Sequence, residues 1–437
     1  MKNVIHSVTL DRDKCKGCTN CIKTCPTQAI RVQKGKAKII KERCIDCGEC
    51  IRVCPYHAKK AVTDPLSMME QFQYNIALPA PTLYGQFSQL TDINVLLNAL
   101  VKLGFDHVFE VAYAAQIITN ETQKLIESGE LETPVINSAC PAVVKLISVR
   151  FPNLINNIVP IISPMDLAAK MAREQAREKT GLADDEIGVF FITPCAAKAT
   201  CTKHPIGMSG SYIDGVFSIS DIYLKLLPYL NDKSEMKTLS KAGLRGVSWA
   251  NSGGEVGGLR TENYIAVDGI HNVIKVLEEL ENDKLGDIDF VEALACTGGC
   301  VGGPLNVENN FVAKTRIKKL AAGVKDNPPP AEERDDVLWD APIPYNPVMN
   351  LDPDIVVAMQ KMQQMSEIYD TLPHLDCGSC GSPSCRTLAE DIVRGFARES
   401  DCIFKLREKV ASLAHEMVEL EELAPPSMQP KNEGELQ

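Results

Sequence analysis

Two shortages in the sequence narrow the classes of protein to which it can belong. Basic residues are in deficit, with 46 lysines and arginines against 57 aspartates and glutamates and a formal net charge of -11. A nucleic-acid partner requires clustered lysine and arginine to neutralise phosphates, so none is expected. The chain also lacks an apolar stretch of transmembrane length and a basic start followed by an apolar run. We therefore expect a cytoplasmic protein with no membrane segment.

Cysteine, by contrast, is abundant, with 17 in 437 residues. A secreted disulfide framework and an intracellular metalloprotein would both explain this number, but the spacings favour metal. The length and the ordinary apolar and charged fractions predict a globular chain of two or three domains. We expect these domains at residues 1–63, 64–335 and 336–437.

A repeated cysteine pattern marks residues 1–63 as a two-cluster 4Fe-4S ferredoxin module. The pattern C-x2-C-x2-C-x3-C-P occurs twice, and in such modules the fourth cysteine of each run ligates the cluster of the other run. The expected ligand sets are Cys15, Cys18, Cys21 with Cys54, and Cys44, Cys47, Cys50 with Cys25. Zinc is the alternative, although it typically uses isolated C-x2-C pairs with distant partners. A module with two clusters and no substrate pocket carries electrons.

A third group of cysteines lies near the C-terminal end, in the pattern C-x2-C-x4-C-x16-C. Its members are Cys377, Cys380, Cys385 and Cys402. Leu388, Ile392 and Phe396 recur at helical spacing and predict a helix that returns Cys402 toward the other three. The pattern resembles a 4Fe-4S module of corrinoid-protein subunits. Tetrahedral zinc is the competing interpretation, because four thiolates suit both metals.

The segments around this group carry weaker signals. The prolines at 328–330 and 342–347 predict a linker that can still wrap the preceding domain. Asp352-Pro353 predicts a helix start, followed by an apolar stripe that is either core or a partner surface. Glu419 to Glu422 predict a solvated, disordered tail.

The middle of the chain alternates buried strands with helices. Residues 108–112, 134–136, 187–192 and 290–295 are predicted strands, and 166–180 is a predicted helix. This alternation is typical of an α/β fold with mainly parallel sheets. Cys140, Cys195 and Cys296 each follow a predicted strand, and ligands collect at this edge of parallel sheets. The following helix N-termini offer backbone donors to an anionic cluster.

Three ordered motifs in this domain resemble the catalytic domain of FeFe hydrogenases. They are Ser138-Ala139-Cys140-Pro141, Thr193 to Lys198, and Cys296-Thr297-Gly298-Gly299-Cys300. The resemblance covers residues 77–307 and implies two mainly parallel sheets flanking an H-cluster. The implied cube ligands are Cys140, Cys195, Cys296 and Cys300, with Cys300 bridging to a di-iron unit that carries carbon monoxide, cyanide and a dithiolate. The chain would then hold four 4Fe-4S clusters and one di-iron subcluster.

The same resemblance implies a set of residues around the di-iron unit. Lys198 would donate a hydrogen bond to a cyanide on the distal iron. Ala80-Pro81-Thr82 is similar to a family segment whose hydroxyl meets the proximal cyanide. Pro194 and Met165 occupy further family positions beside the cofactor. Asn251-Ser252-Gly253-Gly254 is similar to a loop that passes close to the cube, although a plain turn explains it as well.

The sequence departs from fast family members along the proton path. Ala139 stands where they have a proton-donating cysteine, and residues 114–119 lack their carboxylates. Each lost proton-transfer aid typically costs a factor of 10²–10⁴, so slow, reversible turnover is expected. Cys201 and Glu255 are the candidate substitutes. A small buried hydrophobe is the alternative for Cys201, and a surface carboxylate for Glu255.

These departures, together with the C-terminal cysteine module, resemble a branch of the family regarded as sensory for hydrogen or redox state. The resemblance implies hydrogen and protons as substrates, a redox partner such as ferredoxin, and dedicated maturation proteins. An iron-sulfur carrier that lacks the di-iron unit, like the cytosolic assembly relatives of hydrogenases, is the alternative. The sequence leaves the oligomeric state and the signalling partner open.

Overall fold

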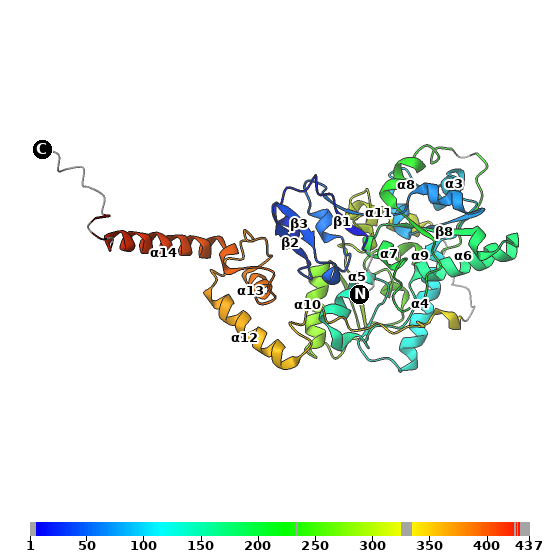
Figure 1. Ribbon diagram of the computed structural model, residues 1–437. Coiled ribbons are helices and arrows are strands. Elements are labelled where there is room, and N and C mark those ends of the chain that lie inside the picture. Colours follow the sequence, from blue (N-terminus) through cyan, green and yellow to red (C-terminus); the bar gives the residue numbers. More distant parts are fainter. Residues whose placement is uncertain (1–5, 233, 325–333, 424, 426, 429–437) are drawn as a thin grey trace. The chain divides into compact units, whose positions relative to one another are not determined.

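The computed structural model describes residues 6–232, 234–324, 334–423, 425 and 427–428 (Figure 1). The chain divides into two compact units. The first contains Met1–Cys15 and Ile39–Met349, and the second contains Lys16–Lys38 and Asn350–Gln437.

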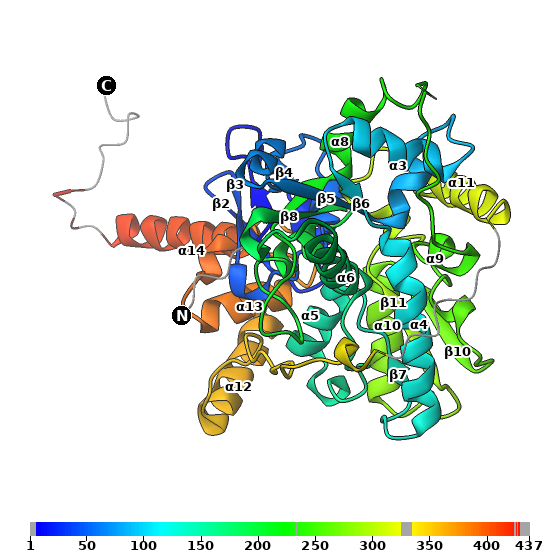
Figure 2. The ribbon, with the colours of Figure 1, turned by 90° about the vertical axis from the view of Figure 1, so that its right-hand side faces the viewer.

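A four-stranded parallel sheet forms the centre of the first unit, in the order β6-β5-β8-β9 (Figure 2). Its strands are β5 (Tyr74–Pro79), β6 (His107–Val108), β8 (Ile187–Thr193) and β9 (Gly215–Ser218). Every residue of β8 is buried. Val189 and Phe191 pack with helices α4 (Val111–Ser128) and α6 (Pro164–Thr180). Phe190 and Ile192 pack on the opposite face with α3 (Ile93–Lys102), α8 (Ile219–Leu226) and α11 (Asn310–Ala322), as the alternation of side chains along a strand requires.

A second parallel sheet has three strands in the order β10-β11-β7. They are β7 (Val135–Ile136), β10 (Tyr264–Asp268) and β11 (Phe290–Leu294). Helices α5 (Pro141–Arg150) and α10 (Ile270–Glu281) pack against it through an apolar cluster that includes Ile136, Val291 and Ala293. The two sheets confirm the predicted α/β architecture with mainly parallel strands.

The strand predicted at 108–112 was too long. The strand β6 ends at Val108, and helix α4 already begins at Val111, because one apolar run serves both elements. Shorter elements complete the first unit: β1 (Val8–Leu10), which pairs antiparallel with β4 (Lys59–Ala61), and helices α2 (Glu49–Arg52), α7 (Ala196–Cys201) and α9 (Leu244–Ser248). Within the described residues, none of the helices is both long and apolar enough to cross a lipid bilayer.

The segment that follows residue 337 runs along the first unit and is held by backbone hydrogen bonds. The Trp339 amide donates to Pro160 at 3.0 Å, and the Asn346 amide donates to Ser148 at 2.9 Å. Part of the predicted linker therefore wraps this unit. The prolines at 328–330 lie outside the described residues.

The second unit contains α1 (Asn20–Lys23), β2 (Ile30–Gln33) and β3 (Lys36–Ile39), which form a two-stranded sheet, and the C-terminal helices. These are α12 (Ile355–Thr371), α13 (Cys385–Val393) and α14 (Ile403–Glu422). A cluster of buried residues including Leu388, Cys385 and Cys402 forms its small core.

Three predictions for this unit were wrong. The N-cap of α12 is Asp354, whose carboxylate accepts hydrogen bonds from the Val356 and Val357 amides. Asp352, where the helix start was predicted, lies two residues before this cap. Helix α13 ends at Val393, and Phe396 lies beyond it with 69% of its surface exposed. The segment 419–422 belongs to α14 and is not a disordered tail, because the apolar periodicity of residues 403–420 continues into it, although residues 419–421 are exposed as predicted.

Candidate active site

The three motifs singled out in the sequence all follow strands of the two parallel sheets. Cys140 is the N-cap of α5 after β7, and Cys195 is the N-cap of α7 after β8. Cys296 and Cys300 follow β11. Strand ends of parallel sheets and helix N-termini are where anionic ligands are bound in α/β proteins. The topology thus brings one cysteine-bearing loop from each motif to such an edge.

The four sulfurs lie close enough to affect one another electrostatically. Burial raises the pKa of Cys300 far above the ordinary thiol value, and the charges of Cys140, Cys195 and Cys296 raise it further. Burial likewise raises the pKa of Cys296 to about 11 and raises that of Cys140 and Cys195. Four thiols in mutual reach, with Cys296 buried and the other three half-buried, are a donor set that suits iron-sulfur clusters or zinc.

Backbone contacts hold two of these loops together. The Leu305 amide donates to the Pro194 carbonyl at 3.0 Å, and a Cβ at Gly303 would lie 2.3 Å from that same oxygen. The glycine-rich segment also lies on the third motif, because the Ser252 amide donates to the Gly298 carbonyl at 3.0 Å. Gly299 has a φ of 96° and leaves no room for a Cβ beside Ser252. Glycine is therefore required at this crossing.

Lys198 is a cationic residue of the site. It lies on α7 with 6% of its surface exposed, and its charge lowers the pKa of Cys140, Cys195 and Cys300. Among the described residues its ammonium makes no hydrogen bond or ion pair, and it lies 5.8 Å from the centre of the Phe191 ring. A buried ammonium without an anion fits a site whose ligand brings negative charge.

Thr82 supplies a second unused donor. It lies in a short helix, Pro81–Gln86, and is fully buried together with Pro81. Its hydroxyl has no hydrogen-bond partner in the described part of the chain. Buried polar groups in native proteins are nearly always satisfied, so this hydroxyl fits a ligand with an acceptor. The donor set and the two unsatisfied donors together fit the iron-sulfur and cyanide-bearing group that the resemblance implies.

A small cavity of about 30 Å³ lies beside the first motif, lined by Ala139, Met165, Asp166, Cys201 and Trp339 among others. Met165 is 2% exposed and Cys201 is 5% exposed. Burial raises the pKa of Cys201 to about 12, so its thiol is protonated at neutral pH. The cavity is roughly the size that one water molecule needs.

Glu255 is buried, with 3% of its surface exposed, so the alternative of a surface carboxylate was wrong. Its carboxylate accepts a hydrogen bond of 2.8 Å from the Asn137 amide group. Burial and the nearby Glu292 raise the pKa of Glu255 to about 8, and the charge of Lys198 acts in the opposite direction. Glu255 therefore carries a proton at neutral pH within the electrostatic reach of Lys198.

Two residues near the site were missed by the sequence analysis. Glu292 lies within β11, 1% exposed, and accepts from the amides of Gly253 and Val256 at 2.8 and 2.9 Å. A single carboxylate inside the apolar run 290–294 was the available signal. Arg52, between Cys50 and Cys54, donates to the Gly302 carbonyl at 2.7 and 3.1 Å. No local pattern indicated that contact.

The ferredoxin cysteines are distributed over both units. Cys15, Cys44, Cys47, Cys50 and Cys54 belong to the first unit, and Cys18, Cys21 and Cys25 belong to the second. The four cysteines of the C-terminal group also belong to the second unit. The Cys25 sulfur accepts a hydrogen bond from the Ala29 amide at 3.2 Å, and the Cys54 sulfur accepts one from the Ala58 amide at 3.3 Å. The pairing of the eight ferredoxin cysteines stays a prediction.

Four thiols gathered at the strand ends of two parallel sheets are typical of an iron-sulfur protein of α/β architecture. The sequence matches the family described as iron only hydrogenase large subunit, C-terminal domain, over residues 73–226 and 223–304. This is more than half of the chain, and the chain belongs to that family. A 4Fe-4S dicluster domain matches residues 7–55, and an Fe-S cluster family matches residues 372–404.

Two relatives illustrate the similarity. The periplasmic [Fe] hydrogenase large subunit of Nitratidesulfovibrio vulgaris is 29% identical over 213 residues, which are 44% of this chain and 51% of the relative. Iron hydrogenase 1 of Clostridium pasteurianum is 24% identical over 394 residues, 74% of this chain and 69% of the relative. The chain thus spans about half the length of the first of these relatives.

Two further comparisons are more distant. The cytosolic Fe-S cluster assembly factor NAR1 of Scheffersomyces stipitis is 22% identical over 228 residues, 46% of this chain and 41% of the relative. The solved structure of a variant of [FeFe]-hydrogenase HydA1 from Chlamydomonas reinhardtii has a TM-score of 0.45 at 17% identity, covering 60% of this chain and 88% of that one.

Proposed function

We propose that this chain is an FeFe hydrogenase that slowly and reversibly combines two protons and two electrons into hydrogen. One observation carries the proposal: four sulfurs from three distant loops, one buried and three half-buried, lie in mutual electrostatic reach around Lys198. The Thr82 hydroxyl supports the proposal, because it has no hydrogen-bond partner among the described residues. This hydroxyl and the Lys198 ammonium could both donate to a ligand that has negative charge or lone pairs. Family membership is consistent with this reaction.

In this proposal Cys140, Cys195, Cys296 and Cys300 hold the cube, and Cys300 also holds the di-iron unit. When bound, that unit supplies the open iron position at which hydrogen is formed and split. Lys198 and Thr82 would donate hydrogen bonds to that unit and hold it in one orientation. The rest of the surface of the di-iron unit would be shielded from water by Pro81, Pro194 and Met165, since Pro81 and Met165 are buried.

The proton is delivered by Glu255, since Ala139 cannot donate one. Glu255 carries the proton at neutral pH, and its pKa of about 8 is near the operating pH that general acid catalysis favours. Cys201 is a second candidate, a protonated thiol on the cavity beside Ala139 and Met165. We attribute the slow turnover to this proton path, which is longer, or less well matched in pKa, than a path that ends in the family's cysteine.

Electrons reach the site through the second cysteine run of the ferredoxin module. Arg52 of that run contacts Gly302, two residues beyond Cys300. A Cβ at Gly48, between Cys47 and Cys50, would lie 2.5 Å from Pro304, so the run lies tightly against this loop. A ferredoxin-type protein would be the outside redox partner, and maturation proteins would install the di-iron unit. Slow turnover with this arrangement also suits a hydrogen- or redox-sensing role.

An iron-sulfur carrier is the second candidate, and the similarity to an assembly factor supports it. A carrier would need the four sulfurs to bind its cluster. It would not require the Lys198 ammonium or the Thr82 hydroxyl, which have no hydrogen-bond partner in the described part of the chain. Lys198 and Thr82 therefore favour the hydrogenase.

Infrared spectroscopy of the matured protein tests the choice. Bands of metal-bound carbon monoxide and cyanide, together with electrode-driven hydrogen turnover, would support the hydrogenase. The Lys198→Met variant should shift the cyanide bands, and Lys203→Met is the matched control because its ammonium pairs with Asp64 instead. Absence of these bands in every redox state would favour the carrier.

A further inference from the structure

Two cysteine-bearing loops meet inside the second unit, one from each end of the chain. The first surrounds Cys18, Cys21 and Cys25, and the second surrounds Cys377, Cys380 and Cys385. The Val32 amide donates to the Gly381 carbonyl at 2.9 Å. The Lys23 ammonium donates to the Pro383 carbonyl at 2.9 Å and also to the Asp376 carbonyl. Backbone groups of the second loop are thus bound directly by the first.

Glycines allow the two loops to touch. Gly378 lies between Cys377 and Cys380, and a Cβ there would lie 3.0 Å from the Lys23 side chain and 3.6 Å from Ile22. Ile22 and Lys23 themselves lie between Cys21 and Cys25. At Gly381, a Cβ would lie 1.9 Å from the Val32 carbonyl oxygen, and the φ of 85° also excludes most side chains. The segments that carry the cysteines are therefore in van der Waals contact.

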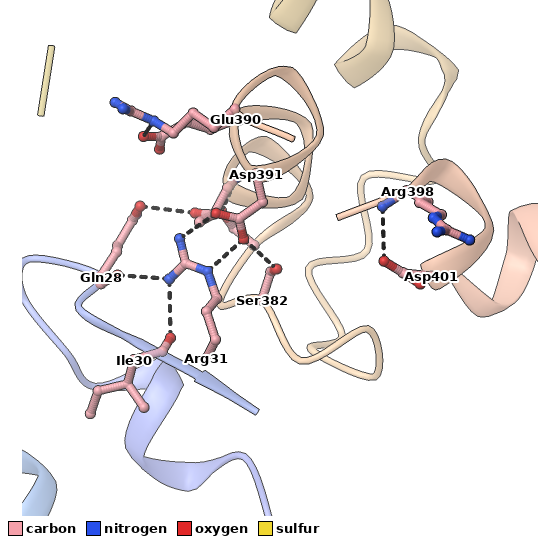
Figure 3. A network of polar contacts seen from close by, with 11 residues as sticks. Gln28, Ile30, Arg31, Ser382, Glu390, Asp391, Arg398 and Asp401 are labelled. Atoms are coloured by element: carbon pink, nitrogen blue, oxygen red, sulfur yellow. Dashed lines mark hydrogen bonds and ion pairs between the residues drawn. The ribbon is translucent and has the colours of Figure 1, made fainter. Parts of the chain in front are cut away.

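A buried ion pair fixes this contact in one orientation (Figure 3). The Arg31 guanidinium binds both carboxylate oxygens of Asp391, at 2.5 and 2.9 Å. The side chains are 6% and 8% exposed. The same carboxylate accepts from the Ser382 hydroxyl at 2.9 Å, and Arg31 also donates to the Gln28 carbonyl at 2.7 Å. Bidentate pairs of this kind specify geometry as well as adding energy.

We propose that the C-terminal cysteine group holds a 4Fe-4S cluster that exchanges electrons directly with the ferredoxin cluster bound in part by Cys18 and Cys21. Each transfer moves one electron: one cube is oxidised, the other is reduced, and no proton is needed. Electron transfer falls steeply with distance, so contact between the two loops makes it fast. The C-terminal cluster is then an electron entry and exit point for a one-electron carrier protein.

The proposal rests on iron-sulfur clusters in both loops and does not need hydrogen turnover. The test therefore uses the full chain loaded with iron and sulfide alone, without the di-iron unit. Electron paramagnetic resonance of the reduced protein should show magnetic coupling between the two clusters. Replacing one ligand of the C-terminal group, Cys380→Ser, should abolish that coupling and slow the spin relaxation of the remaining partner.

Asp391→Asn tests the ion pair, and Glu390→Gln is its matched control. Glu390 precedes Asp391 on α13 but binds Arg394 at 2.8 Å (Figure 3). We expect Asp391→Asn to weaken the coupling and Glu390→Gln to leave it unchanged. Zinc in the C-terminal group, or spectra that are a simple sum of independent clusters, would overturn the proposal. Either outcome leaves the hydrogenase question untouched.

A different observation supports a second inference, about α14. Six apolar residues recur along it at alternating spacings of three and four: Ile403, Leu406, Val410, Leu413, Met417 and Leu420. All six are exposed, from 43% for Ile403 to 67% for Met417. This spacing forms the seam of a left-handed coiled coil.

The charges beside this seam are complementary to a second copy of the same helix. In an antiparallel pair that overlaps all six residues, Val410 faces Leu413 of the second copy and Lys409 faces its Glu416. The twofold symmetry repeats each of these contacts. A parallel pair would instead place Glu416 against Glu421 of the second copy. We infer that α14 forms an antiparallel two-helix coiled coil with a second copy of this chain.

Light scattering and sedimentation of the full chain across the micromolar range test this inference. We expect a dimer that Leu413→Asp converts to a monomer, while the neighbouring Ser412→Asp, which lies off the seam, leaves it intact. Lys409→Glu should weaken the dimer roughly tenfold, and adding Glu416→Lys should restore it. A monomer at every concentration, or a dimer insensitive to these seam and charge variants, would overturn it.

Discussion

The guanidinium of Arg52 donates two hydrogen bonds to the carbonyl oxygen of Gly302, at 2.7 and 3.1 Å. Arg52 lies between two ferredoxin cysteines, and Gly302 lies just after Cys300. The same guanidinium is held by Glu49 at 2.5 Å, within its own helix. One side chain therefore joins the electron-carrying module to the loop of the candidate active site.

Arg52→Gln should loosen this junction. We expect a loss of about 1–2 kcal/mol in the free energy of unfolding, because hydrogen bonds from a charged donor are removed. Electrode-driven turnover should fall while the infrared bands of the matured site stay in place. Lys60→Gln is the control, since Lys60 is 57% exposed and pairs only loosely with Asp11 at 3.6 Å. Equal losses in both variants would contradict a specific role for Arg52.

Glu255→Gln should remove the proton donor and cut turnover by a factor of roughly 10² or more. The loss should be pH-dependent: the parent protein should lose hydrogen evolution as the pH rises through about 8, where Glu255 gives up its proton. The variant should show no such alkaline limb. Film electrochemistry across this pH range measures both effects.

The same substitution should change the pH dependence of stability. Glu255 has its folded pKa raised from 4.5 to about 8, so the folded state holds the proton longer than the unfolded state. Its contribution to stability is therefore lost as the pH rises from about 4.5 to about 8. Glu255→Gln should abolish this decline, which is on the order of a few kcal/mol. Denaturant titrations with parallel pH profiles for parent and variant would contradict the pKa of Glu255.

Ala139→Cys should restore the donor that fast family members carry at this position. Ala139 borders the cavity of about 30 Å³ beside Met165 and Cys201, which gives a thiol room. We expect turnover to rise by about tenfold, less than the 10²–10⁴ of a complete relay, because the next groups on the usual path are also absent. Ser138→Cys is a control on the same cavity. A rise in the control alone would point to a different route.

Thr82→Val should have opposite effects in the empty and the loaded protein. Without the cofactor it should stabilise the fold by about 1 kcal/mol, because it removes a buried hydroxyl that has no partner among the described residues. In the matured protein it should shift the cyanide infrared bands. Thr122→Val on α4 is the matched control, since its buried hydroxyl also lacks a partner there. It should stabilise both forms and shift no band.

Much of the architecture could be read from local pattern. Uniform apolar runs such as 187–192 predicted β8 almost residue for residue, and three of the four predicted strands, 134–136, 187–192 and 290–295, are followed by a motif cysteine. The predicted element boundaries were wrong where one apolar run contains both a strand and a helix, as between Val108 and Val111. They were also wrong where a second aspartate two residues away is the helix cap, as at Asp354. These outcomes depend on backbone hydrogen bonds that the spacing of apolar residues does not encode.

The candidate site was predictable in its sulfurs and much less so in its surroundings. The spacing of cysteines along the chain indicates metal ligands without any knowledge of tertiary contacts. The hydrogen bond and the raised pKa of Glu255, by contrast, involve Asn137 and Glu292, which are far away in the sequence. The Arg31–Asp391 pair joins residues 360 positions apart, so only the folded chain could reveal it.

That buried pair also limits how the C-terminal cysteine group can be transplanted. A fragment that began at Asn350 would keep Asp391 but lose Arg31, which would leave a carboxylate without its counter-charge at a cost of about 3–5 kcal/mol. A gene fusion that borrows this group would therefore have to bring residues 16–38 with it. Engineering and evolutionary shuffling alike should move the two segments as one piece.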